Sequence, residues 1–199
     1  MSSPDAKSKP FGPQSKFNLI SLTYLFSRLA PFIIICYFVL QSLFNQDLKG
    51  VFYIAGVLFS CLLNIFTINM FTSPDTGQPA VCSAIDGMPN SPIGQTILGF
   101  TFGYLSFIIG KAGTENQNLP TFVFFPLMIV FDFVWNWTKG CYGLPSLFLA
   151  LLLGGGFGAL WGLIVWSVDK DLAIMNGISN KDICSMPSKT VFRCKPKAS

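Results

Sequence analysis

Residues 51–71 read VFYIAGVLFSCLLNIFTINMF and carry no charged side chain over their whole length. A helix needs roughly 20 predominantly apolar residues to cross a bilayer, so this stretch predicts a transmembrane helix. On either side of it, further apolar stretches alternate with polar segments that are rich in turn-forming residues. The sequence therefore predicts an all-α fold, a polytopic membrane helical bundle of about five transmembrane helices. The predicted spans are residues 24–44, 51–71, 93–109, 122–137 and 145–168.

The composition agrees with a membrane protein. Of the 199 residues, 51% are hydrophobic and only 11% are charged, whereas soluble domains carry roughly 25% charged residues. We divide the chain into a flexible N-terminal tail (1–16), a transmembrane bundle (17–168) and a polar, basic C-terminal tail (169–199). The start of the bundle, FNLISLTYLFSR at residues 17–28, is expected to lie at the membrane interface.

The number of spans predicts the topology. An odd number of spans places the two termini on opposite sides of the membrane. Residues 72–92 and 138–144 are then expected on the N-terminal side, and residues 110–120 on the other. Lysine and arginine residues near the spans are almost evenly divided between the two sides, so the positive-inside rule does not give the orientation.

Glycines recur in the third and fifth predicted spans. Those of the fifth span fall every four residues, which produces a ridge that lets another helix approach closely. Packing within the chain is the preferred interpretation, and a dimer interface is the alternative. The glycines concerned are Gly99 and Gly103 in the third span and Gly154, Gly158 and Gly162 in the fifth.

A few polar residues fall inside the predicted spans, where each needs a partner. Asp132 and Asn136 lie four residues apart and hence on one helix face, within hydrogen-bonding reach. Asp132 could serve a proton relay or an ion site, but we favour a satisfied carboxyl group near the membrane edge. Asn64, Asn69 and Gln95 are interpreted as bridges between helices rather than as ligands.

The six cysteines divide by predicted location. Cys36 and Cys61 lie in spans and are expected to behave as small apolar residues. The remaining four form one pair on each side of the membrane, so an oxidising compartment would favour one pair and hardly both. We predict a Cys184–Cys194 disulfide if the C-terminal tail meets an oxidising space, with Cys82–Cys141 as the alternative. No cysteine spacing is typical of a zinc site.

Basic residues gather in the C-terminal tail. Such a segment beside a membrane suits anionic head groups or an acidic partner, although ordinary solvation of a tail accounts for it equally well. Binding to nucleic acid is not expected, because no folded basic domain is visible. The candidate contact residues are Lys181, Lys189, Arg193, Lys195 and Lys197.

The order of the last four spans and their loops resembles the core of the type 2 phosphatidic acid phosphatase family. The sequence MPNSP at residues 88–92 opens the third span, where that family has a P-S-G-H motif. The sequence KGCYGL at residues 139–144 precedes the fifth span, and Gly154 and Gly158 follow it. The resemblance covers about residues 51–168 and is one of topology rather than of exact motifs.

The catalytic residues that the resemblance implies are missing. The chain contains no histidine, whereas the family uses one histidine as nucleophile and another as proton donor. The corresponding positions hold Pro145 and Pro92, and the family's orienting aspartate corresponds to Leu149. The basic residues expected before Pro74 are also absent. Because proline and leucine cannot supply these roles, the resemblance implies a relative that has lost catalysis and serves as a scaffold, a pseudoenzyme.

The tail carries a second resemblance. The sequences CSMPSK at residues 184–189 and FRCK at residues 192–195 resemble the short cysteine-bearing tails of predicted multi-pass membrane proteins of large DNA viruses, algal viruses especially. This resemblance implies a virion membrane protein.

These observations lead to three functional classes. We predict a non-catalytic structural or assembly protein, which anchors the internal, host-derived membrane of a large DNA virus to its capsid or serves as a scaffold subunit of a large membrane complex. Its expected partners are the lipid bilayer and other membrane or capsid proteins, with no cofactor, metal or catalytic residue. The first alternative is a small-solute or ion transporter or channel subunit that uses Asp132. The second is a lipid-modifying membrane enzyme.

Overall fold

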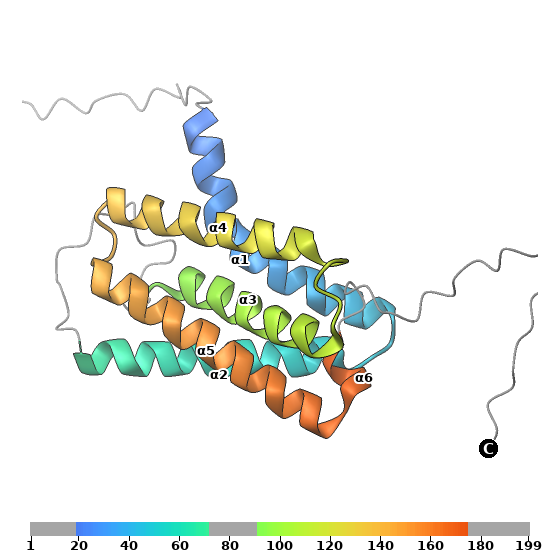
Figure 1. Ribbon diagram of the computed structural model, residues 1–199. Helices are drawn as coiled ribbons and strands as arrows, with labels where there is room; N and C mark the ends of the chain where they lie inside the picture. The colour runs from blue at the N-terminus through green and yellow to red at the C-terminus, as the bar shows by residue number, and fades with distance from the viewer. Residues whose placement is uncertain (1–18, 72–90, 175–199) are drawn as a thin grey trace, which may run out of the picture.

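The computed structural model describes residues 19–71 and 91–174, and this part of the chain is helical (Figure 1). Successive long helices alternate in direction, and a short helix follows the last of them. The prediction of an all-α helical bundle is confirmed. The helices are α1 (Leu19–Phe44), α2 (Lys49–Phe71), α3 (Ile93–Ala112), α4 (Leu119–Thr138), α5 (Leu144–Val168) and α6 (Lys170–Ala173).

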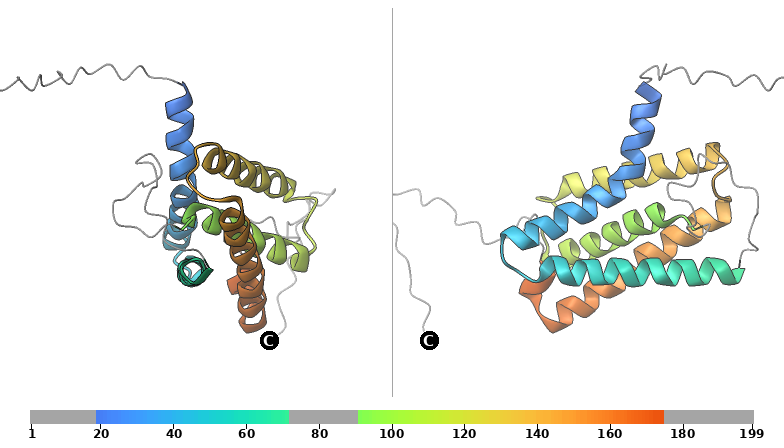
Figure 2. Two further views of the ribbon diagram at one scale, coloured as in Figure 1. Left: turned by 90° about the vertical axis from the view of Figure 1, so that its left-hand side faces the viewer. Right: turned by 180° about the vertical axis from the view of Figure 1, so that it is seen from behind.

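The lengths of the helices fit a bilayer. Helices α2, α3, α4 and α5 are long and apolar enough to cross a membrane, and α1 contributes a shorter apolar segment, Leu29–Phe44. The protein is therefore a multi-pass integral membrane protein. Helix α1 bends, and its first part points away from the other helices (Figures 1 and 2). Pro31 lies inside α1, and a proline within a helix removes one backbone hydrogen bond and kinks the axis.

Helix α3 occupies the centre of the bundle. It is the most buried of the four long spanning helices, and it contacts α1, α2, α4 and α5. The outer helices instead expose large apolar side chains, as Leu62 of α2, Leu127 of α4 and Leu152 of α5 show with exposed fractions of 64%, 67% and 70%. Extended apolar surfaces of this kind are unfavourable in water, so these faces are the ones that contact lipid.

Two helices end in the same glycine-dependent cap. Gly113 after α3 and Gly140 after α4 adopt left-handed backbone conformations, with φ of 62° and 66°. After α4, the N–H of Cys141 donates to the carbonyl of Asn136 and that of Gly140 donates to Trp137. This is the Schellman motif, in which a residue with positive φ closes the helix. It explains why α3 continues to Ala112, beyond the predicted end at residue 109.

The connections at the end of the bundle away from Gly140 are also fixed. In the α1–α2 turn, the N–H of Gly50 donates to the hydroxyl of Ser42, at 2.9 Å. After α5, the chain turns back into α6, where the hydroxyl of Tyr104 donates to the carbonyl of Ala173 at 3.1 Å. Ala173 is fully buried. The first residues of the predicted C-terminal tail therefore pack on the bundle, and the rest of that tail lies outside the described residues.

The alternation of the helices predicts on which side each connection lies. Glu115 lies between α3 and α4, Lys139 lies between α4 and α5, and both side chains are exposed. In sealed vesicles, a membrane-impermeant thiol reagent should label the Glu115→Cys and Lys139→Cys variants from opposite sides. The unsubstituted protein supplies the background from its own cysteines. Labelling of both variants from one side would show that a span has been miscounted.

Candidate functional site

Helices α3 and α5 run in the same direction and contact each other backbone to backbone. A Cβ atom added to Gly154 would lie 2.5 Å from the carbonyl oxygen of Thr96, and one added to Gly158 would collide with the carbonyl oxygen of Phe100. These positions admit only glycine without a shift of the helices, because a backbone atom on the other side cannot rotate out of the way.

The other predicted glycines lie on the same interface. A Cβ on Gly99 would lie 3.0 Å from the carbonyl oxygen of Leu151, and one on Gly103 would collide with the carbonyl oxygen of Gly155. Gly162 differs, since it faces the side chains of α3 rather than its backbone. The structure thus places the predicted ridge against a helix of the same chain.

The sequence reasoning missed two further glycines at close contacts. Gly155 was not part of the four-residue ridge, yet its backbone lies against Gly103. Gly56 of α2 receives the rings of Phe100 and Trp161, each 2.6 Å from where its Cβ would be. The sequence shows Gly56 only as an isolated glycine within a span. The two rings that it receives lie on α3 and α5, and no pattern within α2 indicates them.

Polar contacts join α2 to the pair formed by α3 and α5. The hydroxyls of Tyr53 and Thr101 are 2.6 Å apart, and the indole N–H of Trp161 donates to the carbonyl of Phe52 at 3.0 Å. Tyr53 and Thr101 are fully buried. Hydrogen bonds between membrane helices typically contribute about 0.6 kcal/mol each, so these contacts orient α2 more than they stabilise it.

Buried polar side chains gather at one end of the bundle, and we call this set the polar layer. Its members come from α2, from the start of α3 and from the end of α4. The amide nitrogen of Asn64 donates to the hydroxyl of Ser91 at 2.8 Å. This hydrogen bond joins α2 to the start of α3. Each member is exposed by 6% or less. The polar layer comprises Asn64, Ser91, Gln95, Asp132 and Asn136.

The register of α3 and α4 places Gln95 and Asp132 at the same level along the bundle. The ring of Phe102 on α3 packs on that of Phe125 on α4, with centroids 6.5 Å apart. The two helices run in opposite directions (Figure 1), so a step of seven residues, two helical turns, leads from this pair to Gln95 on α3 and Asp132 on α4. Asp132 also belongs to the buried stripe of α4.

Asn136 is hydrogen-bonded to Asp132, as the four-residue spacing predicted. Its side-chain amide donates to the backbone carbonyl of Asp132, at 2.8 Å, and not to the carboxylate. An asparagine within a helix can donate back to the backbone carbonyl four residues earlier. Asn69 is exposed near the end of α2 and does not belong to the polar layer.

Several atoms of the polar layer lack a hydrogen-bond partner within residues 19–71 and 91–174. They are both amide atoms of Gln95 and the side-chain oxygens of Asn64 and Asn136. A buried polar atom without a partner costs about 1–3 kcal/mol. The arrangement therefore offers mainly acceptor oxygens to a water molecule or a small polar solute.

Two of the segments that carry the family resemblance have described residues at this same end of the bundle. Ser91 and Pro92 precede α3 and are buried, while the connection at residues 139–143 joins α4 to α5. The Lys139 ammonium lies 5.0 Å from the centroid of the Trp135 ring, a cation–π arrangement. Within the described part of the chain, no three His, Cys, Asp or Glu residues are grouped so that they could hold a metal ion.

One cysteine of this end is oxidised. Cys141 is buried and disulfide-bonded, while Cys36 and Cys61 are free. Cys82, Cys184 and Cys194 lie outside the described residues, and so does the predicted Cys184–Cys194 disulfide. The basic residues proposed as head-group or partner contacts also lie outside the described residues, namely Lys181, Lys189, Arg193, Lys195 and Lys197.

Comparison of the chain with protein-family models, with curated proteins and with solved structures finds no match.

The α3–α5 interface predicts opposite effects for two neighbouring glycines of α5. Gly158→Ala should destabilise the protein by about 1–3 kcal/mol, the usual effect of overpacking, because its Cβ collides with the backbone of Phe100. Gly156→Ala is the matched control. A Cβ there has no atom within 4 Å, and alanine favours the helix by about 0.5–1 kcal/mol. Unfolding of both variants in detergent measures the difference. Equal effects would mean that α3 and α5 are farther apart than described.

Proposed function

We propose that this chain is a non-catalytic structural protein of a membrane assembly. The observation that carries the proposal is the contact between α3 and α5, where Gly103 and Gly158 lie directly against backbone atoms. Because their backbones are in contact, α3 and α5 cannot slide or rotate against each other without collision. That rigidity suits a fixed anchor and is unfavourable for a transporter, whose halves must move against each other.

The setting that we propose is the internal membrane of a large DNA virus, where the protein would tie lipid to the capsid. The support is the resemblance of the tail and its concentration of basic residues. A Lys or Arg close to an anionic surface contributes about 1 kcal/mol, so the five from Lys181 to Lys197 could hold the tail against lipid or an acidic partner. A scaffold subunit of another large membrane complex would use the same features.

The residue types at the end of the bundle support the non-catalytic part of the proposal. Relative to the phosphatase motifs, Pro92, Pro145 and Leu149 stand where a proton donor, a nucleophile and its orienting group would be needed. None of these side chains can accept or donate a proton. A lipid-modifying enzyme would have to use other residues, and the polar layer supplies three amides, the hydroxyl of Ser91 and a single carboxyl group.

The second candidate is an ion or small-solute pathway, and the polar layer is the observation that favours it. Gln95 is fully buried among membrane helices with neither amide atom bonded to a residue of the described chain. Polar groups inside a membrane bundle often mark a substrate or ion pathway. Under this proposal Asp132 would supply the charge and the neighbouring amides would replace part of the hydration shell.

Cross-linking in the native membrane tests the structural role. A lysine-reactive cross-linker should join the lysines of residues 181–197 to other proteins of the assembly. Lys139, which lies at the end of the bundle away from α6 (Figure 1), is the internal reference because its cross-links should be fewer and to different proteins. Cross-links confined to the chain itself would contradict the proposal.

Substitution of Gln95 distinguishes the two candidates. In a structural protein, Gln95→Met should be neutral or stabilise the fold by about 1–3 kcal/mol, because it removes unpaired amide atoms. Asn64→Leu is the contrast and should destabilise, since it breaks the hydrogen bond to Ser91. Unfolding in detergent and flux into liposomes are measured on the same preparations. Flux through the unsubstituted protein that Gln95→Met abolishes would favour the pathway and overturn the structural role.

A further inference from the structure

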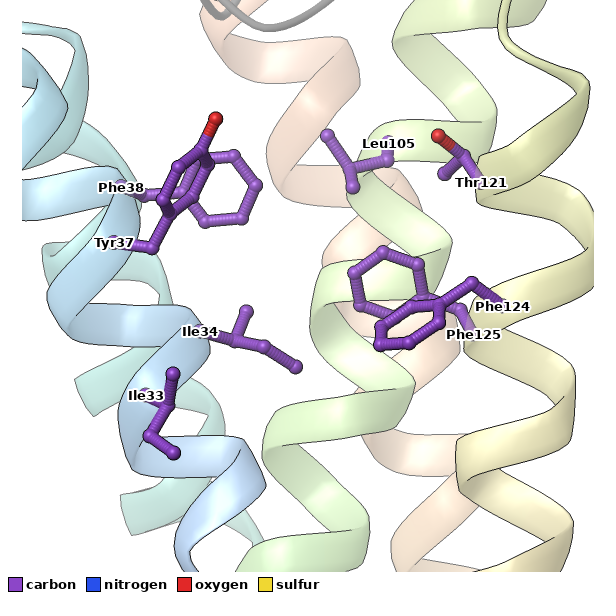
Figure 3. Close-up of a pocket in the computed structure, with 8 residues that line it drawn as sticks. All are labelled: Ile33, Ile34, Tyr37, Phe38, Leu105, Thr121, Phe124 and Phe125. Atoms are coloured by element: carbon purple, nitrogen blue, oxygen red, sulfur yellow. The ribbon is translucent and has the colours of Figure 1, made fainter.

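A groove of about 350 Å³ lies between α1, α3 and α4. Its floor is formed by Phe38 of α1, Leu105 of α3 and Phe125 of α4, which are exposed by only 7%, 4% and 7%. Figure 3 shows these side chains and those of the walls pointing into the same space from the three helices. The groove is distinct from the polar layer, because it lies near the start of α4 and the polar layer near its end.

The groove opens toward the lipid-facing side of the bundle. Its walls include Tyr37 of α1 and Phe124 of α4, with exposed fractions of 54% and 48%. Helix α4 packs on α3, whereas α1 packs mainly on α2 and contacts both α3 and α4 only sparsely. The space between α1 and α4 is therefore not filled by side chains of the described residues, and its surroundings are the apolar faces that contact the bilayer.

The polar atoms of the groove lie together at one end. Figure 3 shows the hydroxyls of Tyr37 and Thr121 at the same end, whereas Ile33 and Ile34 lie toward the other. Thr121 belongs to the first turn of α4 and follows the connection at residues 113–118. This end of the groove is thus close to the membrane boundary, and the purely apolar end reaches toward the middle of the bilayer.

We propose that the groove binds one acyl chain of a membrane phospholipid. The chain would lie along Ile34, Leu105 and Phe125, with its ester group at the hydroxyls of Tyr37 and Thr121. The lipid belongs to the leaflet on the side of residues 113–118. Only in this orientation does its ester group meet the hydroxyls of the groove and its acyl chain the apolar side chains.

The size and chemistry of the groove favour an acyl chain over other occupants. Its volume is at the lower end of the roughly 300–1,000 Å³ of small-molecule sites, which suits one narrow chain. A transmembrane helix is about 10 Å across with its side chains and would need a wider opening. Among the described residues, no charged side chain lines the groove, so the charged part of the head group stays outside it. Such a lipid would fill the gap between α1 and α4 and would hold α1 against the bundle.

Photo-cross-linking tests the proposal. The full chain is reconstituted into phosphatidylcholine vesicles that contain a phosphatidylcholine with a diazirine in its acyl chain, and labelled residues are mapped by mass spectrometry. We expect labelling of the groove residues of α1 and α4 at several times the level of Leu62 and Leu152, which are more exposed but lie outside the groove. Equal labelling of exposed residues all round the bundle would overturn the proposal.

Two sets of variants make the result specific. Ile34→Trp fills the groove and should reduce groove labelling several-fold, whereas Leu152→Trp, on an exposed face, should leave it unchanged. If Ile34→Trp fails to fold, the Tyr37→Phe and Thr121→Val pair preserves the shape and removes both hydroxyls. Native mass spectrometry should then show fewer retained phospholipids than in the unsubstituted protein. Undiminished lipid retention, or protein–protein cross-links through the groove that show a second copy there, would overturn the proposal.

Discussion

The direct contact between the backbones of α3 and α5 is the constraint on which the rest of the bundle depends. In lipid, two apolar helices gain little from hydrophobic burial, because the tails are as apolar as the side chains. Close approach, and the dispersion contacts that it permits, must supply the attraction instead. Gly158 facing the carbonyl of Phe100 shows how far this approach goes. Once α3 and α5 are joined, they present the surface on which α2 and α4 pack.

The polar layer and the glycine interface divide the bundle along its length. On α3, the glycine contacts begin at Thr96, and the polar layer ends one residue earlier at Gln95. The tightly packed part therefore lies toward the middle of the membrane, where unpaired polar groups are most costly. The amides lie nearer the end, beside the connection at residues 139–143, where water is closer. This order is consistent with a rigid core and a more hydrated end.

Much of the bundle could be predicted from the sequence, because long apolar runs and glycine spacing are local signals. The span predicted at residues 51–71 differs from α2 by only the two residues before it. The ridge of Gly154 and Gly158 was visible because four residues complete about one turn. Which atoms face the ridge was not visible. The contact of Gly155 with Gly103 depends on the register between two helices, and no spacing within one helix encodes it.

Other features escaped the sequence for the same reason. Helix α6 packs on the bundle through Tyr104, which lies 69 residues before its partner Ala173, so a polar tail was expected where a short helix is found. The groove depends on the distance between α1 and α4, which no local pattern reports. Even the Asp132 and Asn136 pair was only half predicted. The four-residue spacing gave the shared face, but the choice of the backbone carbonyl as acceptor follows from the side-chain conformation.

The distribution of rigidity in the bundle bears on which function it can serve. Alternating access needs two parts of similar size that rock against each other around a central site. Here the polar layer takes its members from α2, α3 and α4, and α3 is the helix that is joined most tightly to α5. Movement that opened the polar layer would have to separate α3 from a neighbouring helix while α5 holds α3 through backbone contacts.

The less constrained element is α1, which is bent at Pro31 and separated from α4 by the groove. A bundle with a rigid centre and one adjustable outer helix is better suited to fit its surface to lipid and to neighbouring proteins than to move a solute through its core.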